Sequence, residues 1–232
     1  MPARRRTAEA RTELTAPVED YLKAIYEIER AGTAALTNDI AARLAIAPAS
    51  VSGMVRRLAR QKLLRHERYH GVRLTAAGRA AALRTLRRHR ILECYLAQVL
   101  GYDWDGVHAE AERLEHAASD ELVERMAAAL GDPRVDPHGA PIPTRDGTID
   151  ETRHRTLAEL SAGARARVLR MADEDAEFLR YLADLGIRPG VDVTVLSQAP
   201  FDGPISVRVG RSARQIGRNA AERIVIVLNG TA

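Results

Sequence analysis

Four side chains that could bind a metal ion fall within one short segment in the middle of the chain: His108, Glu112, Glu115 and His116. On an ideal helix, at about 100° per residue, they occupy an arc of about 100°. Imidazole nitrogens and carboxylate oxygens together are donors that suit first-row divalent metals. Because Glu112 and His116 are also typical of a surface pair four residues apart, this segment alone leaves both interpretations open.

A second pair upstream, His89 and Glu93, has the same four-residue spacing. If its helix packs against the one that carries His108, donors from both helices converge. The chain has one cysteine, Cys94, which excludes an internal disulfide and a thiolate-rich zinc site, and which we expect to be a buried, inert thiol. The absence of thiolate ligands favours manganese or iron(II) over a closed structural zinc site.

Charge is segregated along the sequence. Lys and Arg outnumber Asp and Glu by 19 to 8 over residues 1–90, are outnumbered by 11 to 3 over 91–136, and nearly balance at 13 to 12 over 137–232. A basic first third is typical of a protein that binds a polyanion such as DNA, and an acidic middle suits cations or a solvated helix face. No apolar run could form a membrane span or a signal peptide, so we expect a cytoplasmic protein.

The first third contains the elements of a DNA-binding unit. Apolar residues at spacings of three and four predict a helix over 17–30, and capping residues predict helices over 37–44 and 47–61. Alternating residues on both sides of a His-Gly pair predict a β-hairpin over 63–75. Helix, short helix, helix and hairpin is the order of a winged helix-turn-helix.

In a helix-turn-helix, the first residues of the second helix face the base edges in the major groove. Small side chains at this point allow a close approach, the serines can bond bases or phosphates, and the arginines can bind the phosphate backbone. The candidate DNA-binding residues are Ala47, Pro48, Ala49, Ser50, Ser52, Arg56, Arg57 and Arg60. The alternative is that the serines only solvate an exposed face and the arginines are ordinary surface charge.

The remaining two thirds divide into a helical part and a β-rich part. We predict a helix from 76 to about 101 and another from 104 or 105 to 130, followed by a segment over 131–148 that has too many Pro and Gly residues for regular structure. The segment 152–167 is ambiguous. A short helix near 173–184 is then expected.

Short β-branched runs over 191–195, 205–209 and 224–228 predict a small all-β barrel at the end of the chain. The fold class is therefore mainly α with a small β part. We expect a winged helix-turn-helix over 1–76, a helical metal-binding and dimerisation domain over 77–143, a linker over 144–165 and an SH3-like domain over 166–232.

These features together resemble the diphtheria toxin repressor family of bacterial metal-dependent regulators, which has iron-responsive and manganese-responsive branches. The resemblance covers most of the chain, and the segment 185–190 is similar to the SH3-like domain of the longer members. Besides the recognition helix, it rests on the motifs VEDYLKAIYE (18–27), LTAAG (74–78), RHRILE (88–93), VHAEAERLEH (107–116) and PHGAPIP (137–143).

The resemblance implies two metal sites. One would consist of Asp20, Glu112, Glu115 and His116. The ancillary site would consist of His89, Glu93 and His108, completed by two residues of the C-terminal domain: Glu174 and Glu177 if a one-residue gap is allowed, or Asp175 and Phe178 without it. We interpret His138, in a Pro-His-Gly turn, as structural.

Three positions bear on the choice of metal. Asp20 stands where the iron regulators have Met, and Glu112 stands where they have Cys. Oxygen in place of sulfur favours Mn²⁺ over Fe²⁺ or Co²⁺. Lys23 stands where a manganese-branch member can have a carboxylate, which favours two separated ions over a close cluster.

The predicted function is a Mn²⁺-activated repressor of metal-uptake genes that binds a palindromic operator as a homodimer. The dimer surface is expected on an apolar stripe of the middle helices: Leu114, Ala118, Leu122 and Met126. The alternative is a metal-independent winged-helix regulator that senses a small organic ligand. We do not expect an enzyme, because the segment 112–116 lacks the first His of a His-x-x-Glu-His zinc protease motif, and no phosphate loop or nucleophile elbow is present.

Overall fold

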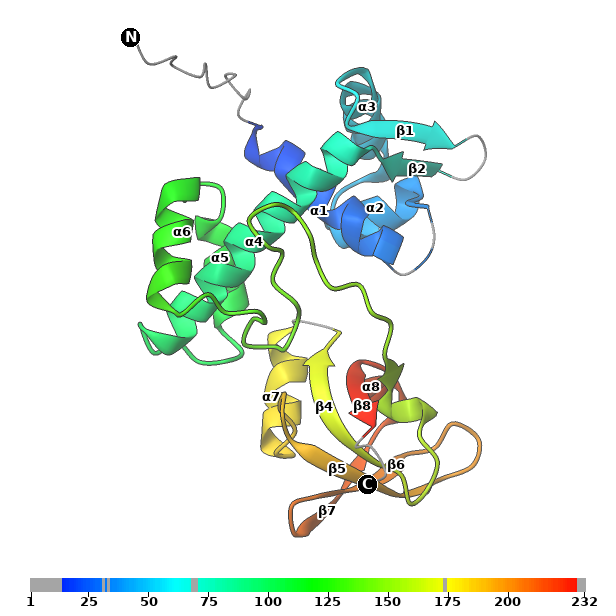
Figure 1. Ribbon diagram of the computed structural model, residues 1–232. Coiled ribbons are helices and arrows are strands. Elements are labelled where there is room, and N and C mark those ends of the chain that lie inside the picture. Colours follow the sequence, from blue (N-terminus) through cyan, green and yellow to red (C-terminus); the bar gives the residue numbers. More distant parts are fainter. Residues whose placement is uncertain (1–13, 31, 33, 68–70, 173–174, 229–232) are drawn as a thin grey trace. The chain divides into compact units, whose positions relative to one another are not determined.

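The chain forms two compact units, which meet in sequence between Ala82 and Leu83. A computed structural model of the protein is shown in Figure 1. It describes residues 14–30, 32, 34–67, 71–172 and 175–228. Within these residues, no helix is long and apolar enough to cross a membrane.

The first unit is a winged helix-turn-helix, as predicted. It contains α1 (Ala16–Arg30), α2 (Thr37–Arg43), α3 (Pro48–Arg60) and the antiparallel hairpin of β1 (Leu64–Glu67) and β2 (Gly71–Leu74). Its core is built from apolar residues of all three helices and both strands, such as Leu22, Ile40, Leu58, Leu64 and Val72, each 3% exposed or less. Figure 1 shows the hairpin next to α3.

The recognition helix α3 has a buried face and an exposed face, and both follow from its sequence. Pro48 takes the first helical position, where its missing N–H costs nothing, after Ala47 in an extended conformation. Val51, Val55 and Leu58 follow at helical spacing and are buried. The rest of the helix surface is thereby left toward solvent.

The second unit begins with a group of three helices. Most of α4 (Ala76–Gln98) packs here against α5 (Val107–Leu114) and α6 (Asp120–Ala129) through a core that includes Ile91, Leu96, Val107, Ala111 and Val123. The prediction of a single helix from 104 or 105 to 130 was wrong. The chain leaves α5 after Leu114 and starts α6 anew.

The physical reason for this break is a helix cap. The side chain of Ser119 accepts a hydrogen bond from the backbone N–H of Leu122, at 3.2 Å, which satisfies one of the free donors at the start of α6. Asp120 and Glu121 then lie in the first turn, where the helix dipole favours negative charge.

The segment 131–148 has no helix or strand, as its Pro and Gly content predicted. Its turn is built by Asp136, whose Oδ1 accepts the backbone N–H groups of His138 (2.8 Å) and Ala140 (2.9 Å). An isolated β-bridge between Val135 and Pro141 closes the turn.

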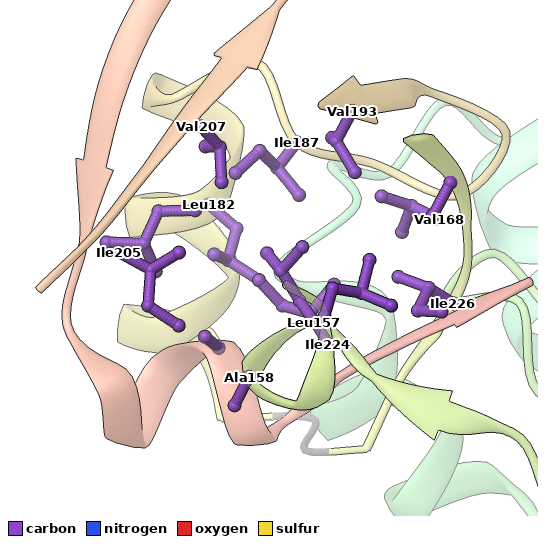
Figure 2. Close-up of a cluster of buried hydrophobic side chains, with 14 of the residues drawn as sticks. Leu157, Ala158, Val168, Leu182, Ile187, Val193, Ile205, Val207, Ile224 and Ile226 are labelled. Atoms are coloured by element: carbon purple, nitrogen blue, oxygen red, sulfur yellow. The ribbon is translucent and has the colours of Figure 1, made fainter. Parts of the chain in front are cut away.

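The end of the chain is a six-stranded antiparallel sheet in the order β3-β8-β4-β5-β6-β7. Its elements are β3 (Arg155–Thr156), the 3-10 helix η1 (Leu157–Glu159), β4 (Arg165–Met171), α7 (Ala176–Asp184), β5 (Asp192–Gln198), β6 (Ile205–Val209), β7 (Ser212–Ile216), α8 (Arg218–Glu222) and β8 (Ile224–Leu228). Figure 2 shows side chains of strands, α7 and η1 packed against one another, including Val168, Leu182, Val207 and Ile226. The predicted small β-rich domain is confirmed.

Two parts of this domain differ from the prediction. The linker expected over 144–165 ends earlier, because β3 and η1 lie within it and Leu157 and Leu160 are buried in the core of the sheet. Strands β4 and β7 were not predicted. In β4 the buried positions alternate with arginines, and β7 is an edge strand that is exposed except at its last residue.

Candidate metal centre and DNA-binding surface

Helices α4 and α5 bring one group of metal-binding side chains together. The Nε2 atom of His89 lies 3.0 Å from Oε1 of Glu93 and 3.1 Å from Nδ1 of His108. His108 Nδ1 is in turn 3.3 Å from the same Glu93 oxygen. Three residues of the expected ancillary site thus offer their donor atoms within 4.8 Å of one another.

The other ring nitrogen of His89 faces the second set of expected ligands. Its Nδ1 atom lies 2.6 Å from Oε2 of Glu115 and 3.8 Å from Oε1 of Glu112. The Nε2 atom of His116 is 3.5 Å from Oε1 of Glu115. The structure therefore places the two predicted ligand sets in contact, with His89 between them.

Local structure explains these positions. His89 and Glu93 are one turn apart on α4, and His108 and Glu112 are one turn apart on α5. Glu115 follows α5 as its C-terminal capping residue and keeps a helical backbone conformation (φ −60°, ψ −30°). For this reason its side chain still lies near the face predicted from a continuous helix.

Burial makes this group electrostatically unusual. The side chains of Glu93 and Glu115 are fully buried, and that of His89 is 3% exposed, whereas Glu112 is 39% exposed. Burial by itself raises the pKa of Glu93, but the adjacent charge of His89 and hydrogen bonds from His108 and His89 outweigh it and hold this pKa well below its ordinary value. The Glu93 carboxylate is therefore ionised at neutral pH.

A further group at the same place was missed by the sequence reasoning. Glu93, Asp136 and His138, all buried, also offer donor atoms within 4.8 Å of one another. His138 Nδ1 lies 3.8 Å from Oε1 of Glu93, while its Nε2 is 2.8 Å from the backbone carbonyl oxygen of Trp104. Since a carbonyl only accepts, Nε2 carries a proton, and in the neutral imidazole Nδ1 is then the nitrogen with the lone pair. The Asp-Pro-His spacing was the available signal.

The donor atoms fit a hard divalent cation. Among the described residues, Glu93 Oε2 and His138 Nδ1 are buried and have no hydrogen-bond partner, so each has a lone pair for a ligand. Cys94 does not join them. Its Sγ is directed to the carbonyl of Val135, and burial together with Asp136 and Glu93 raises the pKa of the thiol to about 12. The cluster thus offers oxygen and nitrogen but no thiolate.

The other predicted ligands come from two other segments of the sequence. Asp20 is on α1 of the first unit. Glu177 is exposed in the first turn of α7 and belongs to none of the ligand groups, and Glu174 lies outside the described residues. In the ungapped assignment, Asp175 uses its carboxylate to cap α7 by accepting the backbone N–H of Phe178, at 2.9 Å.

The candidate DNA-binding residues share one property, which is exposure to solvent. This holds for all eight: Ala47, Pro48, Ala49, Ser50, Ser52, Arg56, Arg57 and Arg60. Ser52, Arg56 and Arg60 are spaced four residues apart and so form one stripe along α3. The geometry suits insertion of the helix into a groove.

The predicted dimer residues do not form one stripe. Leu114 and Leu122 are 37% and 44% exposed, but Ala118 is 7% exposed and Met126 packs against the core of the helical group. The break between α5 and α6 causes this difference, because the four residues no longer lie on a single helix.

Comparisons with known proteins agree with this arrangement. The family model of the iron-dependent repressor N-terminal DNA-binding domain matches residues 13–72, that of the iron-dependent repressor metal-binding and dimerisation domain matches 75–144, and that of the FeoA domain matches 155–228.

Individual relatives match over most of their length. The iron-dependent repressor IdeR of Mycobacterium tuberculosis strain H37Rv is 36% identical over 195 residues, which cover 79% of this chain and 85% of that protein. The diphtheria toxin repressor of Corynebacterium diphtheriae is 32% identical over 205 residues, covering 84% and 89%. A solved structure of a manganese-dependent transcriptional repressor in complex with manganese is 40% identical, with a TM-score of 0.84 over 91% of this chain and 99% of that one. The chain belongs to the diphtheria toxin repressor family of metal-dependent transcriptional repressors.

Proposed function

We propose that this DNA-binding repressor is activated by Mn²⁺, binds a palindromic operator as a homodimer and controls genes of metal uptake. The observation that carries the proposal is the buried group around His89, in which charged carboxylates and imidazoles are held together with donor atoms left open. Buried charges of this kind are costly unless they are paired or bind a metal.

The residues divide into two proposed sites. Glu112, Glu115 and His116, with Asp20 of the first unit, would hold one ion. His89, Glu93 and His108 would hold a second, with Asp136 and His138 as alternative partners of Glu93. A divalent ion bound there supplies positive charge that offsets the mutual repulsion of the carboxylates.

The choice of Mn²⁺ rests on ligand chemistry. Asp20 and Glu112 supply hard oxygen at the positions that distinguish the first site, and the one cysteine of the chain is turned away from the cluster. A similar solved structure is described as a manganese-dependent repressor with manganese bound. Fe²⁺ and Co²⁺ are the competing ions, since IdeR is described as iron-dependent.

The proposed mechanism links the ion to the recognition helix. Without a cation, the carboxylates repel one another, so the arrangement competent for DNA binding is disfavoured. An ion shared by Asp20 and the residues that follow α5 would favour that arrangement. In a homodimer it would set the two α3 helices about one DNA turn, roughly 34 Å, apart.

The test is operator affinity, measured by fluorescence anisotropy with and without Mn²⁺. Wild type is expected to bind much more tightly with Mn²⁺, and Glu112→Ala and His116→Ala should lose most of this gain. Glu121→Ala is the matched control, because it removes an exposed carboxylate of α6 that forms a salt bridge with Arg125. An undiminished Mn²⁺ response in both site variants would overturn the proposal.

The dimer surface is proposed to use Leu114 and Leu122, which remain exposed, together with Val99 and Leu100, which directly follow α4 and are 52% and 58% exposed. A charge at Leu122 would have to be buried in such an interface. Leu122→Glu should therefore shift the protein to a monomer in light scattering after gel filtration, and an intact dimer would exclude this surface.

A further inference from the structure

Trp104, the single tryptophan of the chain, forms hydrogen bonds with the segment that carries His138. Its indole Nε1–H donates to the carbonyl of Pro137 at 2.9 Å. Its own backbone carbonyl accepts from Nε2 of His138 at 2.8 Å, and the two rings lie 5.5 Å apart. Side chain and backbone of Trp104 thus fix the Pro137-His138 dipeptide from two directions.

The other side of the indole contacts the sheet. The guanidinium of Arg188 lies 4.9 Å from the ring centroid, a cation–π distance, and Trp104 packs against the core of the sheet domain. The neighbouring Asp105 accepts from Arg180 of α7 at 2.9 Å. The loop that precedes α5 is therefore held by two arginines of the sheet domain.

The sheet also touches the His138 turn directly. The backbone N–H of Met171, at the end of β4, donates to the carbonyl of His138 at 3.0 Å. Gly139 adopts φ +86°, and a Cβ there would lie 2.1 Å from the carbonyl oxygen of Leu169. Only glycine permits this approach. The position of His138 thus depends on the sheet as well as on α4.

We infer that Trp104, held by Arg188, is a positioning residue that sets Nδ1 of His138 toward Glu93 and so couples the sheet domain to metal affinity. The inference rests on the proposed function, because it assumes that an ion binds at Glu93. Groups that orient a ligand by binding its second ring nitrogen fix both the tautomer and the ring direction. Packing alone would require neither of the two hydrogen bonds that Trp104 makes to this dipeptide.

The experiment is a Mn²⁺ titration of the full chain, followed by calorimetry and by tryptophan fluorescence, which reports on Trp104 alone. Arg188→Met keeps an apolar stem and removes the cation. We expect it to weaken Mn²⁺ binding at this site by about tenfold, within the range of outer-shell substitutions, and to reduce the metal-induced change in emission. Arg211→Met, an exposed arginine between β6 and β7, is the matched control and should behave as wild type.

Two further variants make the result specific. Trp104→Phe keeps an aromatic ring but loses the N–H donor, and calorimetry should show a loss similar to that of Arg188→Met. In a His138→Ala background, where affinity is already reduced, Arg188→Met should add no further loss, as expected for groups that act in series. Folding of each variant is checked by its thermal melt.

The outcomes separate this inference from the proposed function. Wild-type affinity in both Arg188→Met and Trp104→Phe would overturn it, even if His138→Ala binds weakly. Wild-type affinity in His138→Ala would also overturn it, by removing His138 from the site. Failure of the proposed function itself would instead appear as a full Mn²⁺ response of operator binding in Glu112→Ala and His116→Ala.

Discussion

Metal binding to the group around His89 should raise the melting temperature of the second unit by a predictable amount. A ligand that binds only the folded state at one hundred times its Kd stabilises that state by about 2.7 kcal/mol. The unit comprises Leu83–Ala232, and for a domain of this size 1 kcal/mol corresponds to about 2–4 °C. Mn²⁺ at this concentration is therefore expected to raise the melting temperature by about 5–11 °C.

His108→Ala provides the informative variant. Its side chain is 30% exposed, and the substitution removes a nitrogen 3.1 Å from His89 and 3.3 Å from Glu93. If affinity falls about a hundredfold, the same Mn²⁺ concentration equals the new Kd and stabilises by only about 0.4 kcal/mol. The expected rise is then about 1–2 °C.

The assay is differential scanning calorimetry with and without Mn²⁺, at one fixed metal concentration. Glu121→Ala should show the wild-type shift, because this residue belongs to none of the ligand groups among the described residues. The reasoning is refuted if His108→Ala shows the same shift as wild type, since the ion would then bind elsewhere.

Three other predictions concern single residues outside the proposed ligand sets. The buried carboxylate of Asp136 lies 3.2 Å from Nε of Arg90, and Arg90→Met removes this counter-charge. The substitution should lower the free energy of unfolding, measured by urea titration, by about 3–5 kcal/mol. A loss below about 1 kcal/mol would contradict this prediction. Burial raises the pKa of Cys94 to about 12, so only about one thiol in ten thousand is ionised at pH 8. Labelling of this buried thiol by a disulfide reagent should therefore proceed at the rate of unfolding. Rapid labelling of the folded protein would refute the burial argument. Arg56→Gln should weaken DNA binding at all sequences alike and reduce the slope of log affinity against log salt by about 1; an unchanged slope would remove this residue from the phosphate contacts.

The fold was largely predictable where local patterns suffice. The i, i+4 spacings of His89 with Glu93 and of His108 with Glu112 place each pair on one face whatever the helices pack against. The break after Leu114 was missed because the residues there are mostly good helix formers. Its signal, the cap at Ser119, was present in the sequence but was outweighed by helical periodicity.

The part of the site that could not be predicted depends on tertiary contacts. His138 and Asp136 lie in a turn more than 40 residues beyond Glu93, and only the packing of that turn against α4 and β4 brings them together. Strand β4 was hidden because arginines occupy its solvent face. An edge strand such as β7 has no buried face to impose a hydrophobic pattern.

The central claim is that a divalent ion binds among the carboxylates and imidazoles around His89. Anomalous diffraction from crystals of the Mn²⁺-loaded protein, recorded on both sides of the manganese absorption edge, tests it most directly. We predict an anomalous peak in contact with Glu115 and His116, with a second at Glu93. A map that places manganese only on other side chains would contradict the account.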